Sequence, residues 1–96
     1  MAMHTVLEQE KIHRLVEGLR TEHHAAAAAE LLQRGSAAIP ELLAALERRD
    51  VEMRRQAYTV LQQILSGAVA FDPYAPETLR RQQIIELRQR LERRAG

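Results

Sequence analysis

"EHHAAAAAELLQRGSAAIPELLAAL" (residues 22–46) joins five consecutive alanines to a leucine-rich run through an Arg-Gly-Ser break. Alanine has the highest helix propensity of the amino acids, so the first half favours helix strongly. Alanine nevertheless buries less apolar area than leucine or phenylalanine, so it contributes little to a core through its size. We therefore interpret the alanines as positions that must be small because a second helix lies close. The stretch predicts a helix, a tight turn and another helix.

Helix start and stop signals divide the rest of the chain in the same way. Thr5 precedes Glu8 at the spacing of a capping box, and Gly35 and Gly67 have the positions of helix stops. Pro40 fits the first turn of a helix, where its missing N–H costs little. The expected N-caps are Thr5, Thr21, Ser36 and Asp50, with Pro76 opening the last helix. These signals predict five helices, near residues 5–20, 22–34, 37–48, 50–66 and 76–94, with a loop at 67–75. No stretch shows the alternating pattern of a strand, so the fold class is all-α.

Length and composition limit the classes of protein that the chain can represent. Its 96 residues predict one domain, 1–96, and 46% hydrophobic residues with 3% aromatic residues predict an aliphatic core. The net charge of +1 provides no strong field for polyanions or membrane surfaces. With no cysteine, disulfides and thiolate chemistry are excluded. The start lacks the apolar segment of a signal peptide, and no run is long enough for a membrane helix. We expect a soluble, cytoplasmic protein.

The two helical pairs are related by an internal repeat. Leucine and valine positions in 15–19 align with those in 42–46, and the apolar pattern of 28–33 aligns with that of 57–62. Each unit is one helix, a turn and another helix, which is the organisation of stacked helical repeats. The predicted repeats are residues 5–34 and 37–66.

The second unit, "GSAAIPELLAALERRDVEMRRQAYTVLQQI" (35–64), resembles the HEAT repeat. That repeat runs from glycine through small residues, an aliphatic residue, proline and a leucine pair to an acidic turn and a helix with paired arginines. The tail "FDPYAPETLRRQQIIELRQRL" (71–91) is similar to the segment that follows such repeats in some small bacterial HEAT-like proteins. The resemblance implies a short α-solenoid of about two helical hairpins plus a C-terminal helix. It also implies a non-enzymatic role in protein–protein interaction, as an adaptor or small subunit of a larger assembly.

Residues on one face of the stacked helices are the candidates for contact with a partner. Small side chains at two of these positions would allow the partner to approach closely. The candidates are Arg14, Glu17, Glu41, Ala44, Ala45 and Arg48.

The loop and the last helix supply further candidates. Phe71 and Tyr74 flank Asp72 and Pro73, and two interpretations of them stay open. They either fill the space beneath the loop or form an exposed aromatic anchor for a partner. The last helix carries apolar residues over a wide arc, so part of it is expected to meet another protein or a second copy of the chain. These residues are Ile84, Ile85, Leu87 and Leu91.

Nucleic-acid binding is the alternative function. Paired arginines occur at 48–49, 54–55, 80–81 and 93–94, and residues 77–96 contain six arginines and three glutamates. HEAT-like repeats with basic helices bind duplex DNA in some glycosylases, although nucleic-acid modules are usually more basic overall.

Metal binding and catalysis have little support in the sequence. The neighbouring His23 and His24 point about 100° apart on a helix, so they do not share one ion easily. No nucleophile set, carboxylate pair or glycine-rich phosphate loop is present. We expect no metal, no cofactor and no enzymatic activity.

Overall fold

The computed structural model describes the backbone of residues 2–67 and 69–95 and the side chains of 7–67 and 69–94. Within these residues every regular element is helical and no strand occurs, which confirms the all-α prediction. The elements are α1 (Ala2–Gly18), α2 (His24–Arg34), the 3₁₀ turn η1 (Gly35–Ala38), α3 (Ile39–Ala45), α4 (Val51–Leu65) and α5 (Glu77–Ala95).

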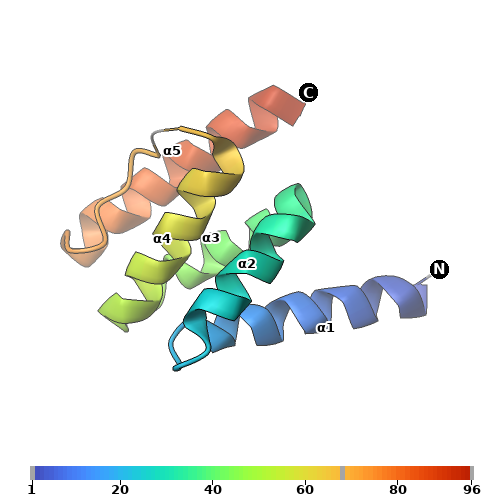
Figure 1. The fold of residues 1–96 in the computed structure, drawn as a ribbon. Helices are drawn as coiled ribbons and strands as arrows, with labels where there is room; N and C mark the ends of the chain where they lie inside the picture. The colour runs from blue at the N-terminus through green and yellow to red at the C-terminus, as the bar shows by residue number, and fades with distance from the viewer. Residues whose placement is uncertain (1, 68, 96) are drawn as a thin grey trace.

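The helices pack as two hairpins with a further helix beside them (Figure 1). α1 packs against α2, and α3 packs against α4. The hairpins lie side by side, because α1 also contacts α3 and α2 also contacts α4. α5 follows a loop that returns along α4, and its buried side chains join the same core (Figure 1).

The core is built almost entirely from aliphatic side chains. Leu31, Leu42, Leu46 and Leu61 are fully buried, and Phe71 is the one aromatic side chain among the buried residues that the structure describes. Further core residues come from every helix: Ile12, Val16, Leu19, Ala27, Ala38, Leu43, Ala45, Met53, Ala57, Val60, Val69, Ile84 and Leu87. Packing of this kind needs contributions from all the helices, since none is apolar enough on its own to bury a core.

The alanine run does bring two helices close together, but at a different residue from the one expected. The repeat alignment predicts that Ala25 and Ala28 face the neighbouring helix. Ala25 is exposed and Ala28 is half-buried, whereas Ala27 is only 6% exposed. A Cβ atom placed on Gly18 would lie 3.3 Å from the Cβ of Ala27, so the ends of α1 and α2 meet where both residues are small.

Three of the predicted caps are wrong. α1 begins at Ala2, which places Thr5 inside the helix. The Thr21 hydroxyl donates to the carbonyl of Gly18 (2.7 Å) and accepts from the N–H of His23 (3.1 Å), so it closes the turn after α1. Ser36 lies inside η1, which leads directly into α3, and so lacks the extended backbone of an N-cap.

Gly35 and Asp50 mark helix boundaries as predicted, whereas the end of α4 is shifted by one residue. Gly35 ends α2 with φ +58°, a backbone conformation that glycine adopts without strain. The Asp50 side chain accepts from the N–H of Glu52 (3.0 Å) and caps α4. α4 ends one residue earlier than predicted, because Ser66 rather than Gly67 takes the left-handed conformation (φ 54°).

Candidate functional site

The predicted partner-binding face on α1 and α3 is partly occupied by contacts within the chain. Glu17 forms an ion pair with Arg48, and Glu41 pairs with His13 at 3.2 Å. Both pairs link α1 to the α3 region, so these four side chains hold the hairpins together. Such pairs are half-exposed and therefore stabilise the fold only modestly.

The remaining residues of that predicted face divide between surface and core. Arg14 and Ala44 are exposed and available to a partner. Ala45 is only 2% exposed and belongs to the core, because α3 turns this position toward the other helices. Its small size therefore serves packing inside the chain.

The two loop aromatics have opposite environments, one buried and one exposed. Phe71 is 6% exposed, and its ring centroid lies 5.9 Å from that of Tyr58 on α4. Tyr74 is 68% exposed and is the most exposed of the large hydrophobic side chains in the described part of the chain. Phe71 fills the space beneath the loop, while Tyr74 points outward.

A buried arginine, Arg54 of α4, connects this loop to the hairpins, and no pattern in the sequence indicates this role. Arg54 donates from Nε to the carbonyl of Pro73 (2.9 Å). Its Nη1 donates to the carbonyls of Arg48 (2.8 Å) and Arg49 (2.7 Å), which lie in the connection between α3 and α4. Burial, and secondarily the nearby charge of Arg80, lower the pKa of Arg54 from its ordinary value. Arg54, which belongs to one of the arginine pairs considered for phosphate contact, therefore makes its hydrogen bonds inside the chain.

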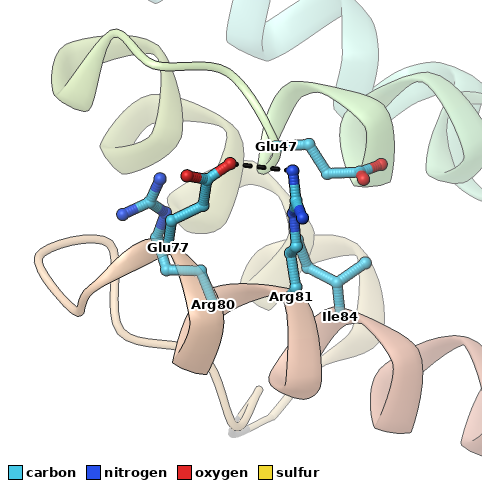
Figure 2. Close-up of a pocket in the computed structure, with 5 residues that line it drawn as sticks. All are labelled: Glu47, Glu77, Arg80, Arg81 and Ile84. Atoms are coloured by element: carbon cyan, nitrogen blue, oxygen red, sulfur yellow. Dashed lines mark hydrogen bonds and ion pairs between the residues drawn. The ribbon is translucent and has the colours of Figure 1, made fainter.

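A small polar pocket lies where the start of α5 faces Glu47 (Figure 2). Its volume is about 100 Å³, and Glu47, Glu77, Arg80, Arg81 and Ile84 line it. Glu77 accepts from Arg81 at 2.9 Å within the pocket (Figure 2), while Glu47 accepts from Arg88 at 3.1 Å. Two carboxylates and two guanidinium groups leave the pocket without a net charge, so it is poorly suited to bind an ion.

A larger apolar groove lies between α3 and the second half of α5. It consists of two adjoining hollows, of about 340 and 440 Å³, which share Ile39, Pro40 and Leu91. We call this surface the α3–α5 groove. Its lining is Ser36, Ile39, Pro40, Leu43, Ile64, Leu65, Arg88, Leu91, Glu92 and Arg94. Leu91 was among the predicted contact residues of the last helix, whereas Ile84 and Leu87 are buried in the core.

The last two turns of α5 are rich in arginine. Residues 88–94 contain four arginines and one glutamate. Arg88 is bound to Glu47, while Arg90, Arg93 and Arg94 are exposed and make no hydrogen bond or ion pair with the described part of the chain. Of the charged residues in this segment, only Arg88, Glu92 and Arg94 line the groove, so charges of both signs stand around its apolar floor.

No family model, curated protein or solved structure matches the chain. Among the described residues, no group of three histidine, aspartate or glutamate side chains is placed to hold a metal ion. None of the described helices has the length and apolar character needed to cross a membrane.

Proposed function

We propose that this chain is a non-enzymatic protein–protein interaction module, serving as an adaptor or small subunit of a larger assembly. We further propose that it is a short α-solenoid of two HEAT-like hairpins with α5 as a terminal helix. The contacts of α1 with α3 and of α2 with α4 support this arrangement, because equivalent helices of successive repeats are neighbours in a solenoid.

The single observation that carries the functional proposal is the α3–α5 groove. Six of its ten lining residues are apolar, and charged side chains stand at its edge. Protein interfaces have this composition, with an apolar centre surrounded by a polar rim. Ser36 and Glu92 are the only nucleophilic or acidic groups in the lining, so the groove presents no pair of groups for acid–base chemistry.

The experiment compares the wild-type chain with Leu91→Glu, which places a charge in the groove. Ile85→Glu is the matched control, because Ile85 lies on the same helix but is 51% exposed outside the groove. Each variant is used to capture proteins from a native lysate, and the captured proteins are quantified by mass spectrometry. We expect proteins that the wild type and Ile85→Glu retain and that Leu91→Glu loses. Identical capture by all three chains would contradict the proposed site.

Nucleic-acid binding is retained as a second candidate because Arg90, Arg93 and Arg94 have no partners within the described part of the chain. Neutralising phosphates releases counterions, so such binding weakens steeply with salt. Retention on heparin and on duplex DNA across a salt series separates the two functions. Strong retention that falls steeply with salt, and that is lost in an Arg90→Glu/Arg94→Glu variant, would favour nucleic acid over a protein partner.

A further inference from the structure

We propose that a ladder of three ion pairs sets the register between the two helical hairpins. Each pair joins the α1–α2 hairpin to the α3–α4 hairpin, and we call the three together the hairpin ladder. The ladder shares no residue with the α3–α5 groove. Its members are His13–Glu41, Glu17–Arg48 and Arg20–Asp50.

The ladder residues of the first hairpin lie one turn apart. Glu17 follows His13 by four residues and Arg20 follows Glu17 by three, spacings that place side chains on one face of a helix. Although α1 ends at Gly18, the N–H of Arg20 donates to the carbonyl of Glu17 (3.4 Å), so the chain still coils there. The partners follow in the same order along the second hairpin: Glu41, Arg48 and Asp50.

The signs of the charges alternate along each side of the ladder. The first hairpin presents His13, which is positive when protonated, then a carboxylate and then a guanidinium group, and the second hairpin presents the opposite order. The third pair is fixed at the start of α4. One carboxylate oxygen of Asp50 lies 3.2 Å from Arg20, while the other accepts from the N–H of Glu52. All three pairs are therefore attractive in the alignment that the structure shows.

Moving the first hairpin by one turn in either direction would bring like charges together. A shift in one direction places Glu17 opposite Glu41, and it also places Arg20 opposite Arg48. The reverse shift places Glu17 opposite Asp50. Because like-charge contacts suppress incorrect pairings, the alternation disfavours both of these alignments.

The buried face of α1 does little to distinguish the alignments. Ile12, Val16 and Leu19 form this face, and they too lie one turn apart. A shift of one turn replaces an aliphatic side chain by another of similar size, which protein cores tolerate. Discrimination between registers therefore falls to the exposed edge of the joint, where the ladder lies.

Modest ion pairs are sufficient for this role. An exposed pair shifts an equilibrium by about twofold, and like charges at helical spacing act with similar size in the opposite direction. A slip that makes two attractive pairs repulsive is therefore disfavoured by about tenfold or more. The ladder can thus select one register while adding little to the free energy of unfolding.

Exchanging two charges on the first hairpin should change the register. Glu17→Arg/Arg20→Glu makes both of these pairs repulsive in the native alignment, whereas a shift of one turn brings opposite charges together. The chain contains no cysteine, so His13→Cys/Glu41→Cys introduces a single pair of thiols at the remaining pair of the ladder. A short thiol-bridging reagent then reports the register, because a slip of one turn moves position 13 by about 5.4 Å along the helix axis.

We expect the exchange to lower the bridging rate at least about fivefold relative to the cysteine pair alone. Adding Arg48→Glu and Asp50→Asn should restore the rate, because the new guanidinium at position 17 then faces a carboxylate and asparagine still caps α4. The matched control is Glu86→Arg/Arg90→Glu. It exchanges the same two residue types at exposed positions of α5, away from the ladder, and should leave the rate unchanged.

Urea denaturation followed by circular dichroism separates a change of register from an opening of the hairpins. The exchange variant should keep the m-value of the wild type, since its core stays packed. Equal bridging rates in the exchange variant and the control would overturn the proposal, as would a lower rate accompanied by a lower m-value. If the exchange variant does not fold, Glu17→Arg is compared with Glu17→Arg/Arg48→Glu in the same assay. Faster bridging in the second variant would then support the ladder, and equal rates would overturn it.

Discussion

Replacing Ala27 with leucine should destabilise the fold much more than the same change at Ala26. Ala27 is 6% exposed and faces Gly18, where even one added carbon on the glycine would lie 3.3 Å from the Ala27 Cβ. Leucine adds three carbon atoms at this point. Because protein interiors are already close-packed, the helices must separate or the side chain must leave its preferred rotamer.

The size of the effect follows from burial at each position. Overpacking a core commonly costs about 1–3 kcal/mol, and we expect Ala27→Leu to lie in the upper half of that range. Ala26 is exposed, and leucine has nearly the helix propensity of alanine, so Ala26→Leu should change the free energy of unfolding by less than about 0.5 kcal/mol. Ala28, which is half-buried, should give an intermediate loss.

Urea denaturation followed by far-UV circular dichroism measures these differences. A loss of packing shifts the midpoint and leaves the m-value unchanged. Equal, small losses at Ala26 and Ala27 would refute the packing argument and would mean that the alanine run serves helix propensity alone.

Two further changes test how the loop is held. Arg54→Met should lower the free energy of unfolding by about 3 kcal/mol, because it removes the donors for three backbone carbonyls. The control Arg55→Met removes only an exposed ion pair and should cost less than about 1 kcal/mol in the same denaturation assay. Equal losses in the two variants would contradict the role of Arg54 in holding the loop. Phe71→Ala should lower the free energy of unfolding by about 3 kcal/mol, because Phe71 is buried. Tyr74→Ala should lower it by less than about 0.5 kcal/mol, because the Tyr74 side chain is 68% exposed. A large loss of stability in Tyr74→Ala would show that Tyr74 packs against the chain in solution.

Features that depend on neighbouring residues in the chain could be predicted from the sequence. Asp50 and Gly35 act within one helical turn, so their roles as cap and stop follow from residue type and position. The all-α class follows in the same way from the spacing of apolar residues. Thr21 and Ser36 have the same residue types as good caps, but each is drawn into a turn whose conformation depends on how the hairpins meet.

Features that depend on the phase of a helix or on distant contacts could not be predicted. Five identical alanines contain no large side chain to mark which face is buried, so a shift of one residue, about 100° around the helix, separates Ala28 from Ala27. Arg54 looks like any member of an arginine pair, and only the return of the loop to α4 places the Pro73 carbonyl beside it. Residues from three helices form the groove, and Leu91 is the one among them that the sequence analysis predicted as a contact residue.

The groove has an explanation in the composition of α5. Ile84, Leu87 and Leu91 follow one another at helical spacing and form the side of α5 that faces the hairpins, with the first two buried and the third partly buried. The next position on that side is Arg94, whose charged head group stays in water. Among the described side chains, the last turn of α5 therefore has no apolar residue to hold it against Ile39 and α4, and the space between them stays open. A basic residue at that position therefore prevents the chain from closing the groove itself.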